Sequence, residues 1–87
     1  MSQSQEHTPL SLLRNVPIRR IIQALEHEGF QFTERKGSQR VYRHPERGRV
    51  VIHYHTGNRS LTPTEIRNLL TGTRWTEEDL RRLGLTS

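Results

Sequence analysis

The segment Lys36–Pro45 reads KGSQRVYRHP and decides the expected fold, because it places a tight turn directly before a short strand. Lys36-Gly37-Ser38 has the composition of a turn, and residues 39–44 are predicted to form a strand. Pro45-Glu46-Arg47-Gly48 is a second turn, and a third strand rich in β-branched and aromatic residues is predicted over 49–55. Short loops between consecutive strands predict an antiparallel meander.

An amphipathic helix is predicted before this meander. Its apolar residues recur at i, i+3, i+4 and i+7, which is the spacing of one helix face: Ile18, Ile21, Ile22 and Leu25. We expect Asn15 to cap this helix, Pro17 to lie in its first turn, and Gly29 to end it. Phe30 and Phe32 then alternate with polar residues, so the first strand is expected to start directly after the helix.

Two further helices are predicted after the meander. Thr62-Pro63-Thr64-Glu65 is a capping box with proline at the first helical position, and the buried face of this helix is expected to be Ile66, Leu69 and Leu70. A last short helix starts after Thr76. Trp75 is placed to pack onto Leu80, and Gly84 is expected to end the helix.

The order of these elements predicts an α+β domain of the type α-β-β-β-α with a short C-terminal helix. Residues 15–85 are expected to form this domain, and residues 1–14, which show no sustained period, a flexible tail. A three-stranded antiparallel sheet with a helix before and after it usually packs both helices on one face. Val50, Ile52 and Tyr54 suit that covered face, which leaves Val51, His53 and His55 on the open one.

Composition favours a nucleic-acid ligand for the open face. The formal charge of the 87-residue chain is +5, from 14 Lys and Arg residues against nine Asp and Glu, and 13 of the 14 are arginine, which binds phosphate bidentately. Six basic residues lie in the fifteen positions from 35 to 49. With Ser38 of the turn they are the candidate RNA-binding residues: Arg35, Lys36, Ser38, Arg40, Arg43, Arg47 and Arg49. The alternative is a solvated basic hairpin without a ligand.

Three histidines could transfer protons in this region: His44, His53 and His55. Imidazole titrates near neutral pH and can take a proton from a ribose 2′-hydroxyl without the help of a metal. His53 and His55 also have the His-x-His spacing of a zinc ligand pair, but the chain has no cysteine and no obvious third ligand, so neither a metal nor a cofactor is predicted. A third alternative is that they are ordinary strand histidines.

These elements together resemble the HicA family of toxin–antitoxin systems, over about residues 15–71. The resemblance rests on residues 24–30 (ALEHEGF), Lys36-Gly37-Ser38, Tyr42-Arg43-His44-Pro45 and the helix start after Leu61. It implies a double-stranded-RNA-binding-like fold and an mRNA interferase activity. In the family the residue after the Gly-Ser pair is the catalytic histidine, whereas this chain has Gln39 there. A glutamine amide can hydrogen-bond a phosphate but cannot act as a general acid or base.

Three hypotheses follow from the resemblance. The chain is a HicA-like toxin that cleaves mRNA without a metal through His53, His55 or His44, or it is an inactive relative that binds RNA, or it acts mainly by docking an antitoxin. The expected partners are mRNA and a HicB-like antitoxin, with the chain a monomer or part of an antitoxin-linked hetero-oligomer. The absence of cysteines and of a long apolar run predicts a cytoplasmic protein without a membrane span.

Overall fold

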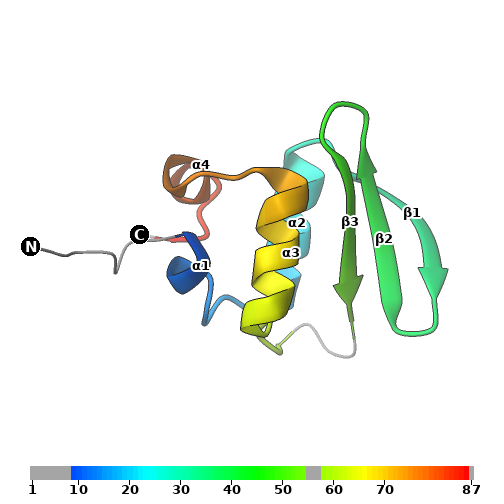
Figure 1. The fold of residues 1–87 in the computed structure, drawn as a ribbon, viewed down its shortest axis with the longest axis horizontal. Coiled ribbons are helices and arrows are strands. Elements are labelled where there is room, and N and C mark those ends of the chain that lie inside the picture. Colours follow the sequence, from blue (N-terminus) through cyan, green and yellow to red (C-terminus); the bar gives the residue numbers. More distant parts are fainter. Residues whose placement is uncertain (1–8, 55–57, 87) are drawn as a thin grey trace, which may run out of the picture.

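The structure is a computed structural model that describes residues 9–54 and 58–86. Its elements follow in the order α1 (Pro9–Leu12), α2 (Ile18–His27), β1 (Gln31–Lys36), β2 (Gln39–His44), β3 (Gly48–His53), α3 (Pro63–Thr73) and α4 (Glu77–Arg82) (Figure 1). The predicted α+β order, with three consecutive strands between two main helices, is therefore confirmed. None of the helices in these ranges is long and apolar enough to cross a membrane.

The sheet is antiparallel and has the strand order β1-β2-β3, so β2 is central and both other strands are edges. Between β2 and β3 the register is regular and pairs Gln39 with His53 and His44 with Gly48. Between β1 and β2 the register shifts after Phe32, where Thr33 is inserted as a bulge. Thr33 Oγ1 donates a hydrogen bond to the carbonyl oxygen of Val41, 3.2 Å away, which ties the bulge to the central strand.

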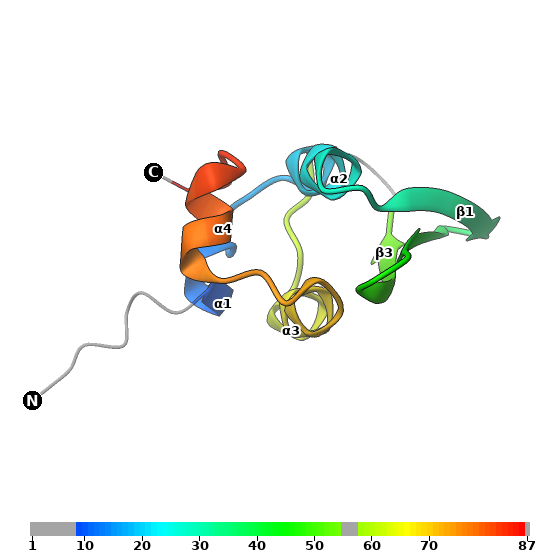
Figure 2. The ribbon, with the colours of Figure 1, turned by 90° about the horizontal axis from the view of Figure 1, so that it is seen from above.

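Helices α2 and α3 lie side by side against one face of the sheet, while α1 and α4 form a further layer at the end away from the strands (Figure 2). The core between them is apolar, and its largest fully buried side chains include Tyr42, Phe30, Ile52, Ile66 and Leu80. Val50 and Ile52 are buried and Tyr54 packs against the core, as the alternation in the third strand predicted. Among the described residues, no helix covers the opposite face of the sheet (Figure 2).

The start of α2 differs from the prediction. Pro17, not Asn15, is the residue that precedes the helix, and it has extended backbone angles with no side-chain cap. Pro17 instead pairs with Ser60 in an isolated antiparallel bridge, and the N–H of Ile18 donates to the carbonyl oxygen of Arg59, 2.8 Å away. A backbone acceptor from a distant loop thus takes the place of a side-chain cap for the first N–H of the helix. Gly29 ends the helix with a φ of 98°, as expected.

The structure describes only residues 9–14 of the range expected to be a flexible tail. Within its described part, Pro9–Leu12 form the short helix α1, and Leu13 is only 1% exposed. Leu10 and Leu12 pack against the core as well. The short apolar run at 10–13 therefore belongs to the packed domain, because it covers core surface between the helices that no sequence period reveals.

The later helices begin as predicted. Thr62 caps α3 in a complete capping box with Glu65, and Thr76 caps α4 in a second box with Asp79. Trp75 and Leu80 are both buried in the core. The third strand, β3, starts at Gly48, one residue earlier than expected, and ends at His53. His55 lies outside the described residues.

Gly72 allows α3 to approach β3 closely, so replacing it is expected to change the free energy of unfolding. A Cβ at this position would lie 2.8 Å from the carbonyl oxygen of Arg49 and 2.8 Å from Cγ2 of Val50. In an open helix Gly→Ala stabilises by about 1 kcal/mol. Here we expect Gly72→Ala to destabilise by about 1–3 kcal/mol, because backbone must shift.

Urea denaturation of Gly72→Ala and of Thr71→Ala measures this effect. Thr71 is exposed on the same helix, so its replacement is expected to change the free energy of unfolding by less than about 0.5 kcal/mol. Stabilisation by Gly72→Ala would contradict the close packing of α3 on β3.

Candidate nucleic-acid interface

The face of the sheet turned away from the helices is called the open face here. Because paired strand residues point to the same side, the register places three rows of side chains across it. These rows are Lys36–Gln39–His53, Glu34–Val41–Val51 and Gln31–Arg43–Arg49. The middle row joins the exposed carboxylate of Glu34 to two valines, of which Val51 is 37% exposed, and it separates two rows that carry polar and basic groups.

Gln39 and His53 are neighbours on this face. They form a cross-strand pair, and Nε2 of Gln39 lies 3.5 Å from Nε2 of His53. The glutamine amide can donate to this ring nitrogen when the nitrogen carries no proton. Both side chains are partly exposed, so a ligand on the open face can reach them. Gln39 is therefore in contact with a histidine of the neighbouring strand.

His44 lies on the opposite side of the sheet. Its ring packs on Phe30 with a centroid distance of 4.9 Å, and its Nδ1 accepts a hydrogen bond from the backbone N–H of Glu46. The ring also lies close to Gly29, after the end of α2: a Cβ added to this glycine would be only 3.3 Å from Nε2 of His44. The structure thus does not bring His44 together with Gln39 and His53, although sequence spacing alone left all three as candidates.

The predicted RNA-binding residues are divided between the two faces. Lys36, Arg43 and Arg49 are exposed and share the open face with His53. Arg35 and Arg40 pair with each other across the strands on the other face, where the Arg40 guanidinium lies 3.9 Å from the ring centroid of Tyr54.

Arg47 and Ser38 are partly engaged by the fold. The Arg47 guanidinium donates to the carbonyl oxygen of Thr73, which holds the second hairpin turn against the end of α3. The carbonyl oxygen of Ser38 accepts a hydrogen bond from the N–H of Tyr54, which extends the pairing between β2 and the residue after β3. The first turn is therefore held next to the end of β3, close to Gln39 and His53.

Arg59 is a residue of the site that the sequence did not single out. Its guanidinium donates to both carboxylate oxygens of Glu65, each 3.2 Å away, and to the carbonyl oxygen of His53 at 2.9 Å and of Ser60 at 3.1 Å. One side chain thus joins the end of β3 to the first turn of α3. No local pattern identifies it, because its partners come together only in the folded chain.

Glu65 has a pKa held below its ordinary value. Burial by itself raises the pKa of this carboxyl, but the hydrogen bonds from Arg59 and from the backbone N–H of Thr62 outweigh it. Glu65 is therefore a carboxylate at neutral pH. Its charge is compensated by Arg59, which leaves His53 beside a neutralised ion pair.

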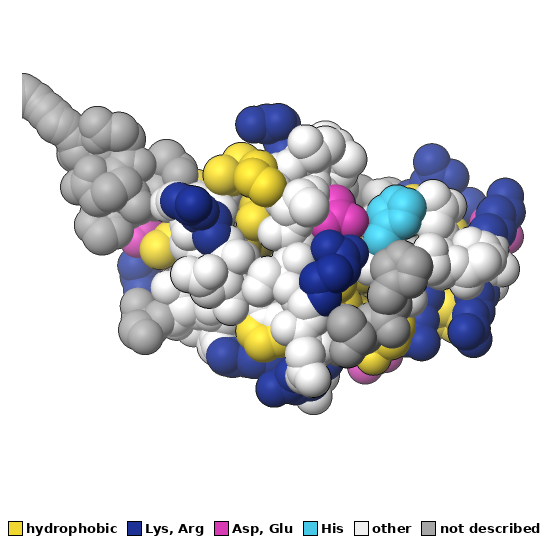
Figure 3. Space-filling model, turned by 90° about the horizontal axis from the view of Figure 1, so that it is seen from below, with side chains coloured by type: hydrophobic (Ala, Val, Ile, Leu, Met, Phe, Trp, Pro, Cys, Tyr) yellow, Lys and Arg dark blue, Asp and Glu magenta, His cyan; other side chains and the backbone are white. Residues whose placement is uncertain are grey.

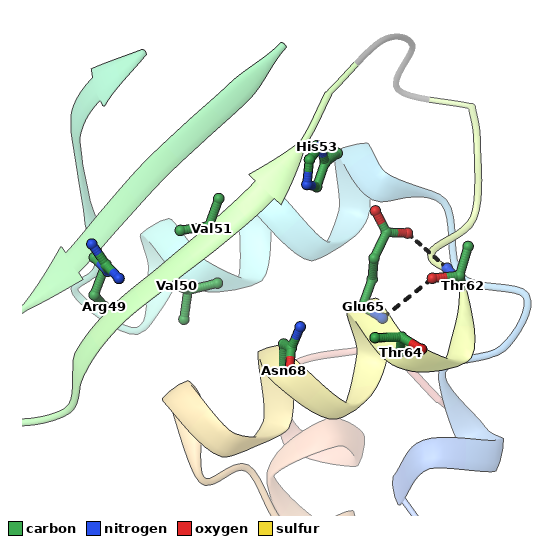
Figure 4. Close-up of a pocket in the computed structure, with 8 residues that line it drawn as sticks. All are labelled: Arg49, Val50, Val51, His53, Thr62, Thr64, Glu65 and Asn68. Atoms are coloured by element: carbon green, nitrogen blue, oxygen red, sulfur yellow. Dashed lines mark hydrogen bonds between the residues drawn. The ribbon is translucent and has the colours of Figure 1, made fainter. Parts of the chain in front are cut away.

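A cleft of about 440 Å³ opens between β3 and the first half of α3. It is lined by Arg49, Val50, Val51, His53, Thr62, Thr64, Glu65 and Asn68, and Figure 4 shows these side chains arranged around it. Viewed from below, the surface carries a histidine next to an acidic and a basic side chain, with further Lys and Arg side chains around the sheet (Figure 3). The cleft adjoins the open face through the residues of β3.

Fold and surface define a class of protein: a small α+β domain whose uncovered antiparallel sheet carries basic residues and a histidine. A family model described as "HicA toxin of bacterial toxin-antitoxin" matches residues 18–71, and the chain belongs to this family. Comparison with curated proteins gave no match. The matched range runs from the first residue of α2 into α3 and includes both Gln39 and His53. Membership implies a partner within a toxin–antitoxin system and RNA as the general target.

Proposed function

We propose that this HicA-family toxin binds mRNA on its open face and cleaves it without a metal, with His53 as the proton-transferring group. The observation that carries this proposal is the 3.5 Å contact between Gln39 and His53. It places an imidazole next to the position where the family has its catalytic histidine. His53 is half-buried at the end of an edge strand, where a ribose can approach it.

The proposed reaction is a transesterification within the RNA. His53 takes the proton of a ribose 2′-hydroxyl, the 2′-oxygen forms a bond to the adjacent phosphorus, and the bond from phosphorus to the 5′-oxygen breaks. The imidazolium of His53 then gives its proton to the leaving 5′-oxygen, so the products are a 2′,3′-cyclic phosphate and a 5′-hydroxyl and His53 is neutral again. The Gln39 amide donates a hydrogen bond to a phosphate oxygen, and Lys36 in the same row adds a positive charge.

A second function is RNA binding without cleavage, and the glutamine itself favours it. Gln39 has no titratable group. Among the described residues, His53 is therefore the one histidine in the Lys36–Gln39–His53 row. A single imidazole then has to serve as base and acid in turn. If one imidazole is not enough for both proton transfers, the toxin acts by holding RNA on the open face and does not cut it.

We further propose that a HicB-like antitoxin neutralises the toxin by covering the open face, within the cytoplasm where mRNA is translated. Exposed Val51 supplies an apolar contact on that face, and Arg43 and Arg49 supply charges that an acidic partner can match. The toxin alone is then a monomer, and its hetero-oligomer forms through the antitoxin.

RNA binding on the open face is tested by salt dependence. We expect Arg43→Ala and Arg49→Ala each to lower the affinity for a single-stranded RNA at low salt, and each to reduce the slope of log affinity against log salt by about 1, because one phosphate contact is lost. Fluorescence anisotropy with labelled RNA measures both quantities.

The matched control for this experiment is Arg81→Ala. Arg81 is an exposed arginine on α4 that pairs with Glu77, and α4 lies away from the sheet. Its replacement removes the same charge but is expected to leave the slope unchanged. Equal effects of all three variants would mean that binding depends on net charge and not on the open face.

A further inference from the structure

The cleft lies between two elements, β3 and α3, that approach each other closely at one end. At one end Gly72 brings α3 against the backbone of Arg49. Toward the start of α3 the two elements separate, and the volume of about 440 Å³ opens between them. The cleft extends along β3 from Arg49 to His53, and its volume falls within the range of small-ligand sites.

Two polar side chains on the α3 wall are uncommitted. Neither Thr64 nor Asn68 has a side-chain hydrogen bond within the part of the chain that the structure describes, whereas Thr62 and Glu65 are engaged in the capping box. Asn68 lies on the side of α3 turned toward β3 (Figure 4). An exposed amide on the wall of a cleft has both a donor and an acceptor free for a ligand.

The β3 wall complements these polar groups. Val50 is buried at its base and Val51 is 37% exposed at its rim, which gives an apolar surface against which a flat ring can lie. Arg49 stands at one end of this wall and His53 at the other. The cleft thus combines an apolar wall and a free amide with a cation at one end and a histidine at the other.

We propose that this cleft is a subsite for one unstacked RNA base next to the phosphate on which His53 acts. This inference rests on the proposed function. Single-stranded RNA is read by splaying bases out, packing their faces on side chains and hydrogen-bonding their edges. The amide of Asn68 provides the edge contact, Val51 the face contact, and Arg49 neutralises an adjoining phosphate. Asparagine amides pair bidentately with adenine N6 and N7, so adenine is the expected base.

Titration of ¹⁵N-labelled full-length protein with the four nucleoside 5′-monophosphates, in buffer with EDTA, tests the subsite by NMR. We expect adenosine monophosphate to shift the amide signals of Val51, Thr64 and Asn68 and to bind at least about fivefold more tightly than uridine monophosphate. Asn68→Ala is expected to remove most of this preference. Gln23→Ala is the matched control, since it removes an exposed amide from α2 without touching the cleft.

The outcomes separate the two proposals. Equal affinities for all four nucleotides, or a base preference that Asn68→Ala leaves unchanged, would overturn the subsite even if RNA binds with the expected salt dependence. Adenosine monophosphate binding in the cleft, together with no binding of single-stranded RNA, would overturn the proposed function. Signal shifts confined to other elements, such as α2 and α4, would also overturn the subsite.

Discussion

Replacing His53 by alanine is expected to lower the rate of metal-free RNA cleavage by at least about 100-fold, the usual contribution of a general acid–base group. The reason is that His53 is the histidine that the structure places beside Gln39 on the open face. Cleavage of a labelled single-stranded RNA in EDTA, followed over time by gel electrophoresis, measures the rate. Appearance of a 2′,3′-cyclic phosphate end identifies the transesterification.

Two other histidines provide matched controls. His27 is exposed on α2, and His44 lies on the covered side of the sheet, so His27→Ala and His44→Ala are each expected to change the rate less than about twofold. His53→Gln keeps a hydrogen-bonding side chain but no titratable group, and it should be as slow as His53→Ala. Normal cleavage by His53→Ala would exclude His53 from proton transfer.

A wild-type protein that does not cleave would instead support RNA binding without catalysis. Gln39→His then becomes informative, because it restores a histidine at the family's position and places it within contact of His53. If cleavage appears in this variant, the open face is competent and only the proton-transferring group is missing.

Replacing Arg59 by alanine is expected to destabilise the fold by about 2–3 kcal/mol, a value reduced from that of a fully buried ion pair because both partners are partly exposed. The side chains of Arg59 and Glu65 are 29% and 21% exposed. Without the guanidinium, the Glu65 carboxylate and the carbonyl oxygen of His53 lose their donors. The free energy of unfolding from urea denaturation measures the change.

The dependence of this effect on pH follows from the pKa of Glu65. Because the folded-state pKa is below the ordinary value of 4.5, the ion pair stabilises the fold fully above that value and loses its contribution as the pH falls through the lower, folded pKa. We therefore expect the cost of Arg59→Ala to be larger at pH 7 than near pH 3. A cost that is the same at both values would mean that the carbonyl contacts of Arg59, and not the ion pair, are responsible.

Arg59→Lys and Arg81→Ala are the controls for this prediction. Lysine keeps the charge but cannot form the planar bidentate contact, so an intermediate cost is expected. Arg81 forms an exposed ion pair with Glu77 within α4, and its loss is expected to cost less than about 0.5 kcal/mol. An equal cost for Arg59→Ala and Arg81→Ala would mean that the contacts of Arg59 stabilise the fold no more than an exposed ion pair does.

The sequence by itself determined the elements that depend on neighbouring residues. The period of Ile18, Ile21 and Leu25 predicted α2, and the capping boxes at Thr62 and Thr76 located α3 and α4. The turns after Lys36 and His44 located the three strands. These signals are local, because caps, turns and periodic faces are each decided within a few residues. The resemblance to the HicA family rested on the same segments.

Only the tertiary structure decided which of the candidates meet. The pairing of β2 with β3 put Gln39 beside His53 and sent His44 to the other face, and this depends on strand register. Likewise, Arg59 joins two elements, β3 and α3, and the cleft lies between these same elements, which approach closely at Gly72. Contacts between residues far apart in the chain leave no periodic signal in the sequence, so they become visible only in the folded structure.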